Sequence, residues 1–239
     1  MAFKQFTLSD GTLLTIYKRK ASRGLRLSVT PEGSARVSIP RWSAYAAGQR
    51  FAESRLEWIK AQQRPAAALV NGQRIGKAHR LRLVAKPNEG KVAARVGKTE
   101  AIVTYPPQLD AAGPAVQDAA RRAGIRALRA EAESLLPQRL AALAGRHGFT
   151  YNQVTIKQMK SRWGSCDRHR NIVLNLFLMQ LPWEQIDYVL LHELTHTEVL
   201  RHGPDFWRAM ERVQPASKQL RQAVRTAQPL LHGASQVVA

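Results

Sequence analysis

The chain has 239 residues, of which 44% are hydrophobic and 23% charged, a balance typical of a folded globular protein. Its 37 lysine and arginine residues against 17 acidic residues give a formal net charge of +20, which favours polyanionic partners. No apolar run reaches the roughly eighteen residues that span a bilayer, and the single cysteine excludes an intrachain disulfide.

The first 110 residues predict a β-rich N-terminal domain with one helix. Strands are expected over about 3–40, where alternating segments are separated by turn signals such as Asp10-Gly11 and Pro31-Glu32-Gly33, and their order predicts an antiparallel meander. A helix is expected over about 43–63, because an apolar stripe recurs there at helical spacing. Further short strands, with turns between them, are expected over about 69–105.

A proline- and glycine-containing stretch, 106–114, then predicts a domain boundary near residue 110, with a second domain over 111–239. Residues 115–147 predict one or two helices with Pro137 as a possible kink. A strand over 152–160, a loop, and a strand over Asn171–Met179 follow. A helix over Pro204–Val213 precedes a stretch that we expect to be a ragged, partly mobile tail. The fold class is therefore predicted to be α+β.

The stretch that carries chemistry is His192-Glu193-Leu194-Thr195-His196, an H-E-x-x-H pattern. Residues four apart lie nearly above one another on a helix, so His192 and His196 can hold one metal ion with Glu193 beside it. His202 follows, and Gly203-Pro204 ends one helix and starts another, so a turn there can bring a third imidazole to the metal. Three protein ligands and an open position predict a catalytic site with one Zn²⁺ ion.

Several motifs, in this order, resemble the YgjP-like family of metal-dependent hydrolases. They are Arg162-Trp163-Gly164-Ser165-Cys166, Asn171-Ile172, Leu174-Asn175, Ile186-Asp187-Tyr188-Val189, His192-Glu193-Leu194-Thr195-His196, His202, Pro204 and Phe206-Trp207. The resemblance is dense over residues 150–210. It implies a zincin-like metallopeptidase domain, related to the SprT-like proteases.

The leading hypothesis is a zinc-dependent metallopeptidase in which a zinc-activated water attacks a peptide bond of a peptide or protein substrate and Glu193 is the general base. One alternative is a metal-dependent phosphohydrolase acting on nucleotides, which the basic charge favours. Another, implied by the resemblance, is a SprT-like protease acting on nucleic-acid-bound proteins. The basic residues are spread along the chain without a long lysine- or arginine-rich block, which favours a solvated, arginine-rich surface over specific nucleic-acid binding. The first residues lack the features of a signal peptide, so we expect a cytoplasmic protein without a membrane partner.

Further side chains are candidates for supporting roles. Tyr188, Arg162 and His169 are candidates for oxyanion or substrate contacts, and Asp205 and Glu198 for orienting a ligand histidine through its second nitrogen. The strand Asn171–Met179 could pair with an extended peptide if it lies at the sheet edge, but it could equally be an interior strand. Cys166 could bind the metal in a latent state, act as a nucleophile, or be a small residue buried in a tight loop.

Overall fold

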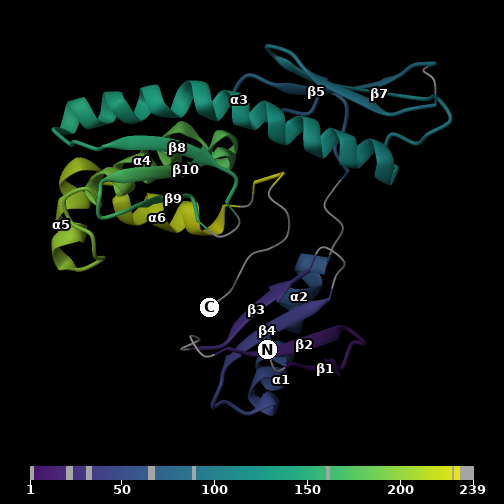
Figure 1. The fold of residues 1–239 in the computed structure, drawn as a ribbon, viewed down its shortest axis with the longest axis horizontal. Coiled ribbons are helices and arrows are strands. Elements are labelled where there is room, and N and C mark those ends of the chain that lie inside the picture. Colours follow the sequence, from purple (N-terminus) through teal and green to yellow (C-terminus); the bar gives the residue numbers. More distant parts are fainter. Residues whose placement is uncertain are drawn as a thin grey trace. The chain divides into compact units, whose positions relative to one another are not determined.

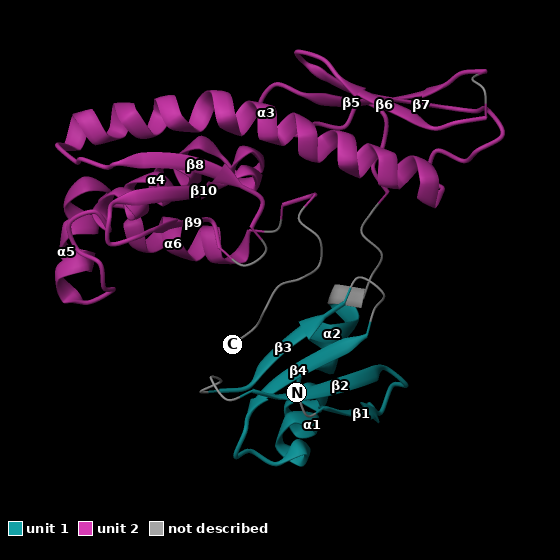
Figure 2. Ribbon diagram, in the orientation of Figure 1, with its two compact units in different colours: residues 1–67, 232–239 teal, residues 68–231 magenta. Residues whose placement is uncertain are grey.

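The computed structural model describes residues 3–19, 24–30, 34–63, 68–87, 90–159, 162–227 and 229–231 (Figure 1). Helices and three small sheets are mixed along the chain, so the predicted α+β class is confirmed. The chain divides into two compact units, residues 1–67 with 232–239 and residues 68–231 (Figure 2). This division differs from the boundary predicted near residue 110. The reason is that the strands before residue 110 share one hydrophobic core with the helices after it.

The first unit contains a four-stranded sheet in the order β1-β2-β4-β3. Its strands are β1 (Phe3–Thr7), β2 (Leu13–Arg19), β3 (Arg26–Val29) and β4 (Ala35–Pro40). β2 and β4 are parallel, and β3 pairs only with β4 among the described strands, so the predicted antiparallel meander is wrong. Alternation along a strand specifies which face is buried, and it does not specify which neighbour the strand pairs with.

Two helices pack against this sheet, α1 (Tyr45–Glu53) and α2 (Leu56–Gln63), where the sequence predicts one helix over 43–63. The break lies at Ser54, whose Oγ donates a hydrogen bond to the Phe51 carbonyl at 2.9 Å. Gly48 lets α1 approach the sheet, because a Cβ there would lie 3.0 Å from the Ile39 side chain. The segment predicted as one helix over 43–63 is therefore two consecutive helices.

In the second unit, a three-stranded sheet precedes a long helix. β5 (Arg80–Ala85), β7 (Glu100–Tyr105) and β6 (Ala93–Val96) lie in this order, and α3 (Pro114–His147) packs against β6 and β7. The sequence predicts strands from residue 69 onwards. Before β5, the described residues form an isolated bridge between Arg74 and Arg80 in place of a strand. α3 is one helix with Pro137 inside it, and it extends over both sheets of this unit (Figure 1).

The second sheet of this unit has the order β8-β10-β9. Its strands are β8 (Gln153–Lys157), β9 (Gly164–Cys166) and β10 (Asn171–Asn175). The strand predicted over Asn171–Met179 ends at Asn175, whose side chain accepts a hydrogen bond from the Phe177 backbone N–H and caps a 3-10 helix, η1 (Leu176–Gln180). β10 is thus the central strand of this sheet, and β9, in a segment predicted to be a loop, lies at its edge.

Three further helices are α4 (Trp183–Thr195), α5 (Pro204–Val213) and α6 (Ser217–Thr226). α6 lies where the sequence predicts a ragged tail; residues 232–239 of that stretch lie outside the described residues. The indole N–H of Trp163 donates to the Val224 carbonyl at 3.2 Å, which ties α6 to the start of β9. Within the described part of the chain, no helix combines the length and the apolarity needed to cross a membrane.

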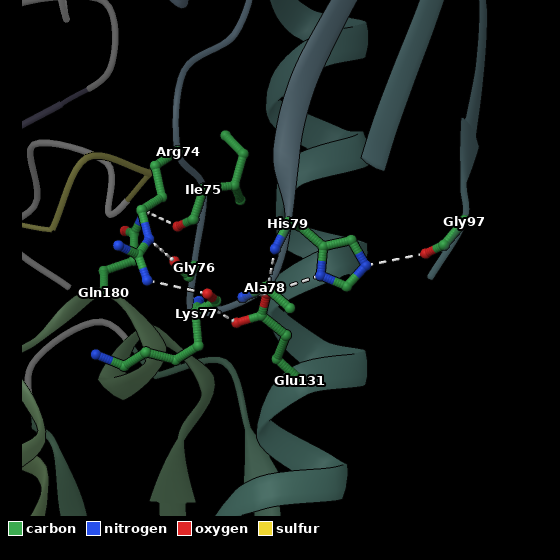
Figure 3. A network of polar contacts seen from close by, with 9 residues as sticks. All are labelled: Arg74, Ile75, Gly76, Lys77, Ala78, His79, Gly97, Glu131 and Gln180. Carbon is green, nitrogen blue, oxygen red and sulfur yellow. Dashed lines mark hydrogen bonds and ion pairs between the residues drawn. The ribbon is translucent and has the colours of Figure 1, made fainter. Parts of the chain in front are cut away.

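A buried carboxylate ties a loop of the second unit to α3 (Figure 3). Glu131 accepts hydrogen bonds from the backbone N–H groups of Lys77, Ala78 and His79 at 2.6, 2.9 and 2.8 Å. His79 Nδ1 lies 2.7 Å from the same carboxylate, and its Nε2 lies 2.9 Å from the Gly97 carbonyl. Burial raises the pKa of Glu131, but the hydrogen bonds outweigh it and the pKa is lowered overall. The carboxylate is therefore ionised at neutral pH.

The same loop and α3 also contact the region around α4. Gln180 donates from its side chain to the Ile75 carbonyl at 2.8 Å, and Lys77 Nζ donates to the Leu181 carbonyl just before α4. Arg139 of α3 donates two hydrogen bonds to the Asp187 carboxylate of α4, at 2.8 and 2.6 Å. Two-pronged contacts of this kind fix orientation as well as distance. The start of α4 is thus held from α3 and from the loop.

Candidate metal centre

His192 and His196 lie at the end of α4, with His192 in its last turn and His196 at its C-cap. The helix is firmly packed, because Ile186, Leu190 and Leu194 are each 0% exposed. A spacing of four residues puts the two imidazoles on one face of the helix. The hydrophobic face of α4 thus fixes the direction in which both rings project.

The chain turns back directly after His196. The Thr197 hydroxyl donates to the Leu194 carbonyl at 2.7 Å, and the Val199 N–H donates to the Thr195 carbonyl at 2.9 Å, so the helix ends in a tight turn. α5 then starts with Pro204 in its first turn, after the N-cap Gly203. His202 lies between the two helices and is thereby returned to the face of α4 that carries the other imidazoles.

The three imidazoles converge through their Nε2 atoms. His202 Nε2 lies 3.0 Å from His192 Nε2 and 3.0 Å from His196 Nε2. His196 Nδ1 lies 3.1 Å from the Val199 carbonyl, so that nitrogen carries the ring proton and Nε2 presents a lone pair. Two facing nitrogen lone pairs this close repel, so a proton or a cation has to lie between them. Zinc bonds of roughly 2.0–2.1 Å place tetrahedral nitrogens about 3.3 Å apart, so a small outward movement would accommodate the ion.

Burial keeps these three imidazole rings neutral, and metal binding requires neutral imidazoles. Burial, with smaller contributions from His196, His202 and Arg221, lowers the pKa of His192 to about 3. Burial also lowers the pKa of His196 and of His202. At neutral pH the cluster therefore offers lone pairs rather than positive charges.

Aromatic side chains of α5 hold the cluster in place. The ring of Phe206, which is 0% exposed, lies 4.8, 4.5 and 4.8 Å from the ring centres of His192, His196 and His202. Trp207 stacks on His202, with ring centres 5.8 Å apart and planes inclined by 17°. The helix that follows the third histidine thus fixes the rotamers of the imidazoles.

Glu193 is the acidic group next to this cluster. Glu193 is 4% exposed, and its Oε2 atom has no hydrogen-bond partner in the described chain. Burial raises the pKa of Glu193 to about 8, and the positive charge of Arg162 opposes the rise. A divalent cation held by the histidines would further favour the charged form.

A cleft of about 500 Å³ opens beside the histidines and Glu193. It is lined by Arg162, Trp163, Gly164, Tyr188, Val189, His192, Glu193, His202, Trp207, Arg221, Val224 and Arg225. The lining combines aromatic rings, arginines and the edge strand β9. The three-histidine cluster is therefore open to a ligand much larger than water.

Comparison with protein families gives a match over most of the chain. The model of the YgjP-like metallopeptidase domain matches residues 23–227. The chain belongs to the YgjP-like metallopeptidase family. The predicted family is thereby confirmed, and membership implies a bound metal ion. No match was found among curated proteins. The chain is also similar to the crystal structure of the metallopeptidase zymogen of Pyrococcus abyssi abylysin, with 26% identity, a TM-score of 0.35, and coverage of 38% of this chain and 93% of that one.

The structure brings some of the other predicted site residues of this YgjP-like chain to the cleft. Tyr188 and Arg162 both line it. Tyr188 is 4% exposed, and burial raises its pKa, so it is a neutral hydrogen-bond donor at physiological pH. Its ring centre lies 6.0 Å from that of His192. Both side chains therefore border the space that a bound substrate would occupy.

Other predicted residues of the YgjP-like chain lie elsewhere. His169 is in the exposed turn between β9 and β10 and accepts a hydrogen bond from Arg168 at 3.1 Å. Asp205 forms an exposed ion pair with Arg208, and Glu198 is exposed. Neither of these two carboxylates orients His192 or His196, since His196 Nδ1 faces a backbone carbonyl and His192 Nδ1 has no partner in the described chain.

Cys166 lies on β9, and its thiol donates to the Asp167 carbonyl at 3.5 Å. Burial raises its pKa to about 11, and the negative charges of Glu193 and Asp167 add to the rise. The side chain is therefore a thiol at neutral pH, whereas a nucleophile or an unassisted metal ligand has to be a thiolate. This environment agrees with the reading of Cys166 as a packed residue.

Sequence reasoning missed several features of this YgjP-like site. It assigned no role at the site to Gly164, Arg221 and Trp207, which line the cleft, or to Phe206, whose ring contacts the three imidazoles. Phe206 and Trp207 follow His202 by four and five residues. That proximity is the signal that could have linked them to the candidate metal ligands.

Proposed function

We propose that the protein is a zinc-dependent peptidase of the zincin type, in which His192, His196 and His202 hold one Zn²⁺ ion. The observation that carries the proposal is the convergence of three neutral imidazoles through Nε2, beside a buried carboxyl group in an open cleft. Zinc, when bound, supplies a Lewis acid that lowers the pKa of water towards about 7.

Glu193 is the general base in this proposal. It takes a proton from the attacking water and returns the proton to the leaving amine. The residue suits this role because its carboxyl group is buried and its pKa is raised, so it can both accept and donate near neutral pH. Tyr188 or Arg162 would donate a hydrogen bond to the oxygen on which negative charge develops.

The peptide backbone would be held by β9. This strand pairs with β10 alone among the described strands, so its other edge can pair with an extended peptide. The central position of β10 excludes the role considered for the strand Asn171–Met179. A peptide along β9 would pass the Glu193 carboxylate, because Gly164 lies against it.

The test is hydrolysis of casein or of a peptide library by the zinc-loaded protein and by Glu193→Gln. We expect the variant to keep its zinc and to lose hydrolysis, by a factor of at least 100 if the carboxylate is the base. The matched control is Glu198→Gln, the same substitution at an exposed position five residues later. Hydrolysis by Glu193→Gln at the control's rate would refute the assignment of the base.

A second candidate is a metal-dependent phosphohydrolase acting on nucleotides. The observation that favours it is the presence of Arg162, Arg221 and Arg225 in the lining of the cleft, because guanidinium groups bind phosphate well. Measurement of phosphate or pyrophosphate release from nucleoside triphosphates separates the candidates. Peptide hydrolysis without such release supports the peptidase.

A further inference from the structure

The cleft carries an unbalanced positive charge on one of its sides. Arg162, Arg221 and Arg225 line it, and Glu193 is its sole acidic residue among those described. No side chain of these three arginines forms an ion pair or a hydrogen bond with the described residues. Among the described residues, the lining thus sets three arginines against one carboxyl group.

One hydrogen bond joins the two segments that carry the three arginines. Arg221 and Arg225 are four residues apart on α6, so they project from one face of this helix. The carbonyl of Val224, between them, accepts the hydrogen bond from Trp163, which follows Arg162 directly. The contact between α6 and the start of β9 therefore brings the arginines of two distant segments to one side of the cleft.

Arg221 lies next to the candidate metal ligands. Its guanidinium carbon is 4.2 Å from the centre of the Trp207 ring, and Trp207 stacks on His202. Stacking on a tryptophan restricts the guanidinium while leaving its N–H groups available at the rim.

We propose that this arginine group selects peptide substrates with an aspartate or glutamate side chain beside the cleaved bond. A carboxylate can accept paired hydrogen bonds from a guanidinium, and Glu193 is the one acidic side chain among the described residues that line the cleft. The inference rests on the proposed peptidase function and adds the chemistry of the substrate. A phosphate group shares this chemistry, and the test separates the two.

The first experiment compares three peptides that differ only in one residue beside the cleaved bond, Glu, Gln or Lys. We expect the zinc-loaded protein to show a kcat/KM about tenfold higher for Glu than for Gln, because a hydrogen bond between two charged groups is stronger than one to a neutral amide. Arg221→Glu should reverse the order and favour the Lys peptide, and Arg221→Lys should retain a reduced preference for Glu. The control is Arg212→Glu on α5, an exposed arginine outside the cleft with the same change of charge. Equal kcat/KM values for the three peptides, or the same behaviour of Arg221→Glu and Arg212→Glu, would overturn the inference.

The second experiment measures binding without turnover. Fluorescence anisotropy of the labelled Glu and Gln peptides, and of a labelled nucleoside triphosphate, is followed on the full chain carrying Glu193→Gln. Tighter binding of the Glu peptide than of the Gln peptide, lost when Arg221→Glu is added, supports the inference even if no peptide hydrolysis is found. Binding of the nucleoside triphosphate alone would overturn it in favour of a phosphate-bearing substrate. A failure of the peptidase function is thus distinguishable from a failure of the charge preference.

Discussion

A Cβ atom added to Gly164 would lie 2.6 Å from the Oε1 atom of Glu193. The Cγ and Cδ atoms of the same side chain would lie 2.7 and 2.8 Å away, so the entire end of the glutamate fills the space above the glycine. Glycine at the edge strand therefore sets the position of the proposed base. In the proposed function, this close approach would also place an extended peptide on β9 within reach of the carboxylate.

Gly164→Ala should reduce peptide hydrolysis without loss of zinc. The added methyl group forces the buried Glu193 side chain to move, and a displacement of about 1 Å at a reacting group costs roughly 10- to 100-fold in rate. The measurements are kcat on a peptide substrate and zinc content per protein. The matched control is Gly145→Ala, an exposed helical position where a new Cβ would meet no atom within 4 Å. Unchanged kcat in Gly164→Ala would show that the base has room to adjust.

His202→Ala should weaken zinc binding by at least about 100-fold, because it removes one of the three imidazoles that converge through Nε2. His169→Ala is the matched control, since that imidazole lies in an exposed turn and does not line the cleft. Competition with a chromophoric chelator measures the affinity. Zinc should also raise the Tm of the control and much less that of His202→Ala, because a ligand of the folded state stabilises it. Equal zinc affinity of the two variants would exclude His202 as a ligand.

The convergence of the three histidines was the most predictable feature of the molecule, and the surroundings of these histidines were the least predictable. The spacing of His192 and His196 specifies one helix face, and Gly203-Pro204 specifies where the next helix starts, so local signals sufficed. By contrast, α6 buries only Ser217 and Val224 of its residues. From the sequence, its arginines cannot be distinguished from those of a solvated helix surface. The contact between Trp163 and Val224, which places them at the cleft, is seen only in the structure.

Pairing between distant segments was equally invisible in the sequence. The parallel register of β2 with β4 depends on which neighbour each strand meets, and an alternating pattern is compatible with either neighbour. The sequence placed a boundary near residue 110 because prolines and glycines cluster there. The core shared by α3 and β7 shows that this segment connects elements within one unit.

Glu131→Gln should destabilise the second unit by roughly 2–4 kcal/mol. The carboxylate accepts three backbone N–H hydrogen bonds and contacts His79, and an amide offers one acceptor oxygen and puts an N–H₂ group where acceptors are needed. Thermal and urea unfolding measure the change. Glu133→Gln is the matched control, because Glu133 is an exposed residue on the same helix with a loose ion pair to Arg129 at 3.7 Å. A Tm for Glu131→Gln equal to that of the control would contradict the structural role of the buried carboxylate.

The same carboxylate predicts an acid limit of stability. The pKa of Glu131 in the folded protein is below its ordinary value of 4.5, so the folded state binds this proton less readily than the unfolded state. Its stabilising contribution is thus fully present above about pH 4.5 and is lost as the pH falls through the lower, folded-state pKa. In urea unfolding from pH 7 to pH 3, the free energy of unfolding of the wild-type protein should exceed that of Glu131→Gln at neutral pH. This difference should shrink only in the acid range. A difference between the two proteins that stays constant down to pH 3 would mean that the carboxylate is not preferentially ionised in the folded state.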